Sequence, residues 1–384
     1  MKKIISLLLF LSMLFVAACG NNNLFELDTT TLTTAETQTS PVDNGNQIEL
    51  DTIGEAPPTT SEAQTPPIDG GNQVDVAVVD YKILGQSIDD LLTDGDFSGT
   101  VLVEQGGEII LRKAYGLADV ENNIENSIDT AFYIGSTTKQ ITGAAILALE
   151  ADGKLDTSDT LDVFFLEYGI DNLKNITVAN LLAMGGGFGG VPHREMEAVT
   201  SKDVEVSVIH NWSSDNHGYS NSDYWLLGRI IERVSGMTYE EYIWTRLFEP
   251  AGMTNSGFGD THKSALAYSG SGDVFPRSPF TVPYSSGGIV SSVDDLSLWM
   301  DAYFGGKLFP ETMLERVTGG YNYGWYLNHN PIWHHSGSIL GFSTYLIYDR
   351  YSDTKIILLS NREYQAHGFS FKISSIVLDV IIST

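Results

Sequence analysis

The stretch Ala131-Phe-Tyr-Ile-Gly-Ser136-Thr-Thr-Lys139-Gln140 leads directly into Ile141-Thr-Gly-Ala-Ala-Ile-Leu-Ala-Leu-Glu150. Apolar residues at positions 141, 144, 145, 147 and 149 predict a helix with an apolar face, which should stop near Gly153. Ser136 and Lys139 lie three residues apart at its entrance, so a helix would bring their Cβ atoms to about 5–6 Å. A hydroxyl beside an amine is the minimum apparatus for an activated serine nucleophile. Alone this pattern is weak, because a Ser and a Lys in the first turn of a helix are usually solvated.

The charge of the chain argues against several classes of partner. Its 384 residues contain 21 Lys and Arg against 49 Asp and Glu, a net charge of −28. Nucleic acid needs a basic footprint, so we expect no nucleic-acid partner. An acidic surface mainly favours solubility, and the length allows one large or two moderate domains.

The cysteine count and the missing motifs point away from metals and cofactors. Cys19 is the one cysteine, so disulfides and cysteine-based metal sites are excluded from the rest of the chain. The chain has no H-E-x-x-H pair, and Gly185-Gly-Gly-Phe-Gly-Gly190 lacks the Lys of a phosphate-binding loop. We therefore expect no metal and no cofactor.

The N-terminus resembles a bacterial lipoprotein leader. Lys2 and Lys3 precede an apolar run at residues 4–18, which is too short to span a bilayer and fits a signal peptide over residues 1–18. The phrase Val16-Ala-Ala-Cys19-Gly resembles the lipobox, which implies that Cys19 is lipidated; ordinary cleavage beside a bystander cysteine is the alternative. The prediction is an extracytoplasmic protein held by a lipid anchor to the cell membrane, or to the periplasmic side of the outer membrane.

Residues 19–80 are expected to form a disordered, acidic stalk rich in Thr and Pro. Residues 20–80 contain 11 acidic side chains and no Lys or Arg. Residues 34–47 recur in similar form at 60–73, an offset of 26. Two copies of a polar segment cannot bury a core, so the repeat indicates a stalk and not a solenoid.

Residues 81–384 carry the patterns of a folded α/β domain. Residues 83–92 predict a helix, and residues 97–103 and 108–114 predict a hairpin around Gly106-Gly107. Helical patterns dominate to about residue 250, strand-like runs return at 332–333, 343–348 and 355–360, and residues 369–381 predict a last helix. The sequence thus predicts an α/β part from about 81–150 and 285–384, with a mostly helical part, about 151–284, inserted between them.

Two further stretches contain candidate site residues. Tyr219-Ser-Asn221 lies just before a predicted helix and offers a phenol that can relay protons and an amide that can hold a substrate; a capping Asn with a packing Tyr is the alternative. The second is Trp333-His334-His335-Ser-Gly337-Ser338, on a predicted strand. Its glycine would allow a close approach to the backbone. Its adjacent histidines make a poor metal site, because neighbours on a strand point to opposite faces.

Together and in this order, these stretches resemble the motifs of the penicillin-recognising serine hydrolases, which comprise class C β-lactamases, D-alanyl-D-alanine carboxypeptidases and their esterase relatives. That family has S-x-x-K, then Y-x-N, then K/H-x-G. Framework phrases at 97–103, 115–119, 247–253 and 286–292 extend the resemblance over nearly all of residues 81–365. It implies a β-lactamase-like antiparallel sheet flanked by N- and C-terminal helices, with an inserted, mostly helical subdomain.

The resemblance also implies roles for the motif residues. Ser136 would attack a carbonyl and form an acyl-enzyme, Lys139 would help to take its proton, and Tyr219 would exchange protons with the reacting groups. Asn221 would position the substrate or the lysine.

The third motif would form the opposite wall of the site. His335 would face the polar end of the substrate and Gly337 would keep the wall flat. The backbone N–H groups of Ser136 and Ser338 would form an oxyanion hole, at about 3–4 kcal/mol per donor.

Two departures from the family pattern affect the expected substrate. His335 stands where class C β-lactamases have Lys, and a neutral imidazole is a weaker anchor for a carboxylate. This favours the carboxypeptidase and esterase members. Met184-Gly-Gly-Gly187 replaces a His-Thr-Ser-Gly phrase that is frequent in the family, and this could alter a loop near the cleft.

The leading hypothesis is a lipid-anchored serine hydrolase that forms an acyl-enzyme from an amide or ester. D-alanyl peptides of cell-wall precursors are the first expected substrate class, small esters the second and β-lactams the third. A non-catalytic surface protein that binds peptidoglycan or a partner is the alternative of another class; it predicts a missing catalytic residue, and none is missing.

Overall fold

The computed structural model describes residues 80–189, 201–259, 263–275, 284–317, 319–328 and 332–382. All of them belong to one structural unit, Gln73–Thr384. The predicted signal peptide, Cys19 and the stalk up to residue 79 lie outside the described residues.

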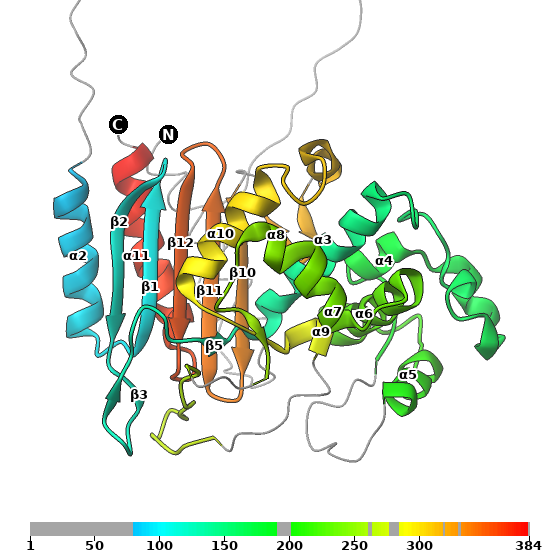
Figure 1. The fold of residues 1–384 in the computed structure, drawn as a ribbon, viewed down its shortest axis with the longest axis horizontal. Helices are drawn as coiled ribbons and strands as arrows, with labels where there is room; N and C mark the ends of the chain where they lie inside the picture. Colours follow the sequence, from blue (N-terminus) through cyan, green and yellow to red (C-terminus); the bar gives the residue numbers. More distant parts are fainter. Residues whose placement is uncertain are drawn as a thin grey trace, which may run out of the picture. The chain divides into compact units, whose positions relative to one another are not determined.

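A seven-stranded antiparallel sheet organises this unit, in the order β2-β1-β12-β11-β10-β9-β8. Its strands are β1 (Gly99–Gln105), β2 (Glu108–Tyr115), β8 (Gly320–Asn322), β9 (Trp325–Leu327), β10 (Ile332–Ile339), β11 (Phe342–Asp349) and β12 (Thr354–Ser360). The predicted hairpin is confirmed as β1 and β2, and β1 also pairs with β12 from Gly99↔Ser360 to Gln105↔Thr354. The two ends of the folded unit therefore meet in the middle of one sheet (Figure 1).

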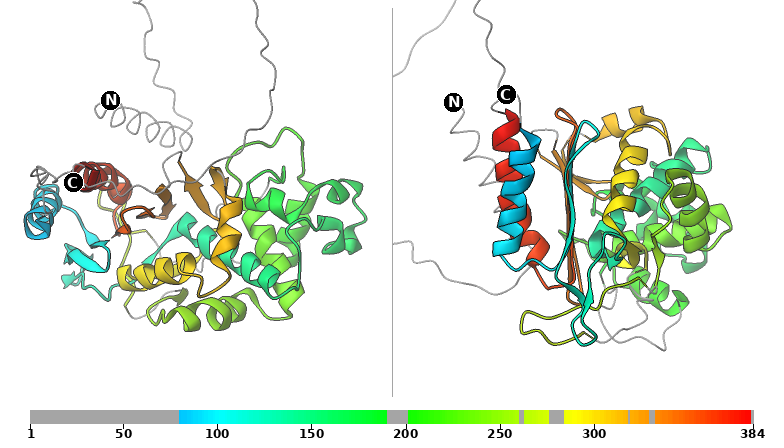
Figure 2. Two further views of the ribbon diagram at one scale, coloured as in Figure 1. Left: turned by 90° about the horizontal axis from the view of Figure 1, so that it is seen from above. Right: turned by 60° about the vertical axis from the view of Figure 1, so that its left-hand side comes forward.

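Two terminal helices cover one face of the sheet. Helix α2 (Tyr81–Asp94) packs on β2, and α11 (Gln365–Ile382) packs on β11 and β12. They lie side by side in Figure 2, right, with α10 (Val293–Phe304) on the opposite face. Asp80 begins α2 because its carboxylate accepts the backbone N–H groups of Lys82 and Ile83.

The middle of the chain is mainly helical, as predicted, with short strands added. Its α-helices are α3 (Thr138–Ala151), α4 (Val178–Leu182), α5 (Ser201–His210), α6 (Asn221–Ser235), α7 (Tyr239–Ile243), α8 (Glu249–Ala251) and α9 (Tyr284–Gly287). The 3₁₀-helices are η2 (Gly135–Thr137), η3 (Leu161–Val163), η4 (Leu166–Tyr168), η5 (Asp171–Asn175) and η7 (Glu311–Arg316), and η6 (Trp244–Phe248) is a short π-helix. Small sheets pair β3 (Leu117–Asp119) with β4 (Ile124–Glu125), and β5 (Phe132–Tyr133) and β6 (Gly257–Phe258) with β7 (Ile289–Ser291).

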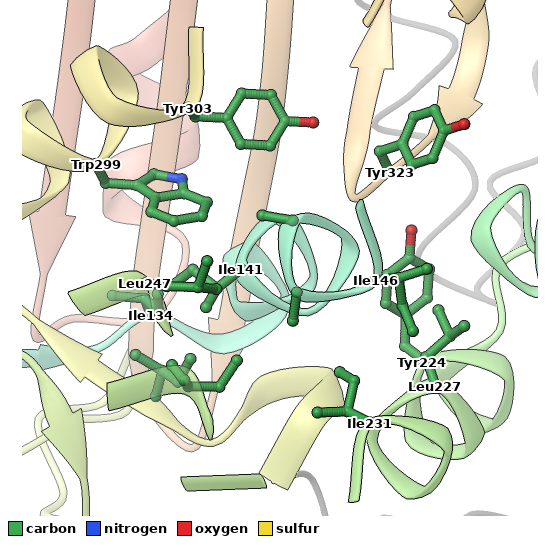
Figure 3. Close-up of a cluster of buried hydrophobic side chains, with 14 of the residues drawn as sticks. Ile134, Ile141, Ile146, Tyr224, Leu227, Ile231, Leu247, Trp299, Tyr303 and Tyr323 are labelled. Atoms are coloured by element: carbon green, nitrogen blue, oxygen red, sulfur yellow. The ribbon is translucent and has the colours of Figure 1, made fainter. Parts of the chain in front are cut away.

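Helix α3 differs from the predicted amphipathic helix, because every residue from Thr138 to Leu149 is buried. It runs through the middle of the fold, with Trp299 of α10 on one side and the residues of α6 on another (Figure 3). A helix that contacts neighbours all round must bury its polar side chains as well as its apolar ones. Lys139, Gln140 and Thr142 are each 0% exposed for this reason.

The fold class is confirmed: a mixed α/β fold with a large antiparallel sheet, two terminal helices on one face, and a mostly helical insertion. Of the helices in the described part of the chain, none combines the length and the apolar character needed to cross a bilayer.

Candidate active site

Ser136 lies at the junction between the small sheet and the central helix. β5 pairs with β7 and is followed by the turn η2, which contains Ser136 and leads directly into α3. Gly135 has a φ of 53°, the left-handed region that glycine adopts most easily. Ser136 is half-buried while the residues on either side of it are buried, so the turn presents its hydroxyl at the surface of the core.

Strand β10 lies directly against the turn that carries the serine. A Cβ added at Gly337 would come within 2.0 Å of the Ile134 carbonyl oxygen, and one at Gly135 within 2.8 Å of the Ser338 nitrogen. The glycine at position 337 is therefore needed because the backbone of Ile134, in the same protein, packs directly against it. This packing places the amide of Ser338 beside the turn of Ser136, the arrangement that an oxyanion hole requires.

Lys139 is fully buried next to the serine. Its Nζ lies 3.3 Å from Ser136 Oγ, 2.7 Å from Asn221 Oδ1 and 2.7 Å from the Ser286 carbonyl oxygen. Burial lowers the pKa of this amine well below its ordinary value. A neutral amine has two N–H donors and one lone pair, so it can donate to the two close oxygens and accept the proton of Ser136.

Helix α6 begins at Asn221 and thereby positions the second motif. The Ser220 hydroxyl oxygen accepts the Asp223 backbone N–H at 3.0 Å and caps this helix. Asn221 is the first residue of the helix, and its side-chain oxygen accepts a hydrogen bond from Lys139. The capping residue is therefore Ser220 and not Asn221, as the alternative interpretation had it.

Tyr219 lies over the lysine and the serine. The Nζ of Lys139 is 4.8 Å from the centre of its ring. Loss of solvation raises the pKa of the Tyr219 phenol, and a hydrogen bond with Ser136 acts in the opposite direction. The residue as a whole is 45% exposed, so part of Tyr219 faces solvent while its phenol is hydrogen-bonded to Ser136.

His335 forms the facing wall and is 1% exposed. Its Nδ1 lies 2.5 Å from the Ser336 carbonyl oxygen, and its Nε2 lies 3.1 Å from the Tyr321 hydroxyl. A carbonyl oxygen can only accept, so this network assigns the proton to Nδ1, and Nε2 accepts from Tyr321. Burial is the main cause that lowers the pKa of His335, to about 3, so the ring is neutral at pH 7.

The neighbouring histidine belongs to a different environment. His334 Nδ1 lies 3.3 Å from the Tyr345 hydroxyl of β11, and burial lowers the pKa of His334 to about 4. Its alternation with His335 follows the period of the strand.

Two site residues were missed by the sequence interpretation. Tyr321 belongs to the short edge strand β8, and Ser286 belongs to the short helix α9 and contributes only its carbonyl to Lys139. The signal for Tyr321 was the glycine-flanked aromatic stretch Gly319-Gly-Tyr-Asn-Tyr-Gly324, which resembles a short strand between turns. A backbone carbonyl leaves no such signal.

The loop Met184–Gly187, which departs from the family pattern, is bonded to the start of α6. The Gly186 N–H donates to Asp223 Oδ2 at 2.9 Å, and the Ser220 N–H lies 3.4 Å from Met184 Sδ. Asp223 is 0% exposed, and burial raises the pKa of its carboxyl to about 7. The loop therefore supports the segment that carries Tyr219 and Asn221.

The three predicted motifs thus converge from η2 with α3, from the start of α6 and from β10. They bring together a hydroxyl, an amine whose pKa is lowered by burial, a phenol and two adjacent backbone amide positions. Such a set can form and hydrolyse an ester bond at Ser136.

Comparisons with known proteins agree with this arrangement. The sequence pattern of the family described as Beta-lactamase matches residues 84–377. The chain is 34% identical over 302 residues to the putative penicillin-binding protein PbpX of Bacillus subtilis, covering 73% of this chain and 75% of that protein. It is 30% identical to protein Flp of Staphylococcus aureus over 72% of this chain, and spans 63% of the length of Flp.

Solved structures show the same fold at lower identity. FmtA of Staphylococcus aureus superimposes with a TM-score of 0.70 at 20% identity, over 78% of this chain and 86% of FmtA. The penicillin-binding protein of Bacillus halodurans has a TM-score of 0.67 at 24% identity, over 75% of this chain and 99% of that one. From the match over residues 84–377 and the 34% identity to PbpX, the chain belongs to the Beta-lactamase family of serine hydrolases.

Proposed function

We propose that the chain hydrolyses an amide or ester through an acyl-enzyme on Ser136. The Oγ of Ser136 attacks the substrate carbonyl and its proton passes to the Lys139 amine. The oxyanion is held by the N–H groups of Ser136 and Ser338. When the tetrahedral intermediate collapses, the C–N or C–O bond breaks and the leaving group takes a proton by way of Tyr219. Water then cleaves the acyl ester and restores the serine.

The observation that carries this proposal is the position of the Lys139 amine. It is buried, 3.3 Å from Ser136 Oγ, and satisfied on its other sides by the oxygens of Asn221 and Ser286. An amine in this setting has no carboxylate partner among its hydrogen bonds to keep it charged. It is therefore suited to act as a general base near neutral pH.

Two substrate classes have support. D-alanyl peptides of the cell wall are supported by the similarity to a protein named as a penicillin-binding protein. Amides and esters without a carboxylate on the leaving group are supported by the neutral His335. A preference for D-alanyl substrates depends on the acyl group, whereas a preference for or against a carboxylate depends on the leaving group. The two preferences can therefore be tested separately.

Covalent labelling tests the proposal. A purified chain starting after the stalk should react with a fluorescent fluorophosphonate, and Ser136→Ala should remove the label. Mass spectrometry of the labelled peptide should place the adduct on Ser136. Labelling that survives Ser136→Ala would refute the assignment of the nucleophile, and a folded wild type that neither labels nor turns over any ester would favour the binding protein.

The proposed location is the outside of the cell membrane, through a lipid on Cys19. The support is the lipobox-like phrase at residues 16–20 and the apolar run before it. Cys19→Ala should move the protein from the membrane fraction to the soluble fraction. An unchanged membrane fraction would contradict the anchor.

A further inference from the structure

The wall opposite Ser136 is built from aromatic rings. The ring of His335 packs against Tyr321 and Tyr326, with ring centres 5.5 and 5.4 Å away, and the two tyrosine rings lie 4.6 Å from each other. Tyr219 lies 6.2 Å from Tyr321 and 6.4 Å from His335. These four rings come from β10, β8, β9 and the segment before α6. The surface that they form is suited to a flat or apolar group.

The polar atoms of His335 are already engaged within the protein. The Nδ1–H donates to Ser336, and Nε2 is occupied by the hydroxyl of Tyr321. The imidazole therefore has no N–H left for a carboxylate of the substrate, and it carries no charge. Tyr321 supports this state because its hydroxyl is the partner of Nε2, at 3.1 Å.

The amine of the site does not replace the missing charge. Among the residues that the structure describes, Lys139 is the basic side chain in contact with Ser136, Tyr219 and Asn221, and its amine is engaged there in hydrogen bonds with Ser136, Asn221 and Ser286. Most of the other described cations hold the protein's own carboxylates, as in the pairs Arg112–Asp294, Arg229–Glu205, Arg316–Glu150, Lys355–Glu104 and Arg362–Asp96.

We propose that this site selects amides and esters whose leaving group carries no carboxylate, and that Tyr321 is the positioning residue that sets this preference through His335. The proposal rests on acyl-enzyme formation at Ser136 and deepens it. A charged leaving group would lose its water beside a histidine that offers neither a charge nor a free N–H, and this loss is unfavourable. An uncharged, flat leaving group would retain contact with the rings of Tyr321 and Tyr326.

A matched pair of substrates tests the preference. N-benzoyl-D-alanyl thioglycolate and its methyl ester share the acyl group and the reacting thioester bond, and differ only in one carboxylate on the leaving thiol. Released thiol is measured for both, and rates are divided by the enzyme-free rates. The wild type should favour the methyl ester by about tenfold or more in kcat/KM, since tenfold corresponds to ~1.4 kcal/mol in the transition state.

Two variants separate positioning by Tyr321 from a structural role. Tyr321→Phe keeps the ring and removes the hydroxyl, so Nε2 can acquire a proton and offer a donor to the carboxylate. The preference should fall severalfold in this variant, whereas the wild-type preference should be flat between pH 8 and pH 5, because the pKa of His335 lies near 3. His335→Lys should reduce or reverse the preference directly. Tyr351→Phe, at an 87% exposed position, is the matched control and should leave both rates unchanged.

The pH dependence must be interpreted with the other titratable groups that face His335. These are Lys139 of α3, Tyr219 before α6, Tyr321 of β8, Tyr326 of β9, His334 of β10 and His367 of α11. Their effect on the reacting thioester is common to the two substrates and cancels in the ratio of the two rates, so the ratio reports only the groups that act on the carboxylate.

Each outcome is decisive. A wild type that forms the Ser136 adduct but prefers the carboxylate-bearing thioester would overturn this inference and leave the acyl-enzyme intact. A Tyr321→Phe variant that slows both thioesters equally at every pH would reduce Tyr321 to a packing residue. Absence of the Ser136 adduct would instead refute the acyl-enzyme itself.

Discussion

The side-chain oxygen of Asn221 lies 2.7 Å from the amine nitrogen of Lys139 and accepts one of its hydrogens. A neutral acceptor at this distance satisfies the amine without adding a charge that would hold its proton. The amide of Asn221 therefore helps to keep Lys139 competent as a base.

Asn221→Asp should convert this relationship into an ion pair. A carboxylate at the same distance raises the pKa of the lysine, so Lys139 stays protonated and cannot accept the proton of Ser136. We expect kcat/KM for a thioester at pH 7 to fall by about 100-fold, within the range of general-base catalysis, and the ascending limb of its pH profile to move to higher pH. Asn172→Asp, on the exposed surface, is the control. An ascending limb that stays in place would contradict the role given to Asn221.

Tyr219→Phe should separate proton relay from packing. The ring stays above Lys139, and only the hydroxyl that connects with Ser136 is lost. Acylation should slow by about 10²–10⁴-fold, the usual range for losing a positioned acid or base, while thermal stability changes little. Stopped-flow measurement of the acylation burst is the readout. Full acylation with a slowed release of the acyl group would restrict Tyr219 to deacylation.

Gly337→Ala should damage both the fold and the oxyanion hole. Its methyl group would lie 2.0 Å from the Ile134 oxygen and 2.4 Å from Thr344 Oγ1, so β10 and the serine turn must move apart. We expect a loss of about 1–3 kcal/mol in the free energy of unfolding, typical of overpacking, together with a large loss of kcat. Gly257→Ala, on a strand with open space around the added methyl, should be nearly neutral in denaturant titrations. Wild-type kcat in Gly337→Ala would show that β10 can shift without disturbing the site.

The sequence predicted the parts of this site that depend on spacing along the chain. Ser136 and Lys139 share a turn, Tyr219 and Asn221 precede a helix, and alternation along a strand separates His334 from His335. The sequence did not predict contacts between residues that lie far apart in the chain. The burial of Lys139 arises because α3 is surrounded on all sides, and the bond from Tyr321 to His335 arises from the pairing of edge strands.

The local patterns of the fold were accurate for a similar reason. The hairpin at Gly106-Gly107 and the last helix follow from turn residues and periodicity, and the structure differs by a few residues at their ends. The apolar face predicted for α3 was incomplete, since its polar residues are buried by tertiary packing that no local pattern records. The hydrogen bond between Gly186 of the Met184–Gly187 loop and Asp223 likewise joins two residues that lie 37 positions apart in the sequence.

Asp223→Asn should make the protein more stable at high pH. The folded state raises the pKa of Asp223 from 3.8 to about 7, mainly through burial. A raised pKa means that the folded protein holds its proton more tightly than the unfolded chain. The stability this provides is complete below pH 3.8 and is lost progressively as the pH rises through 7. Between pH 5 and pH 8 the wild type should lose about 2–3 kcal/mol from this one group.

An asparagine has no proton to lose and can still accept the Gly186 N–H, so the variant should lack this part of the pH dependence. Urea titrations of both proteins at pH 5 and pH 8 measure the difference, with the exposed Asp94→Asn as the control. The same change should alter the pH dependence of activity little, because Asp223 acts on the segment of Tyr219 and Asn221 and has no bond to Lys139 or Ser136 among those that fix it. If the variant and the wild type lose stability in parallel between pH 5 and pH 8, then Asp223 is ionised in the folded protein throughout this range, and the loop at Gly186 rests on a charged carboxylate.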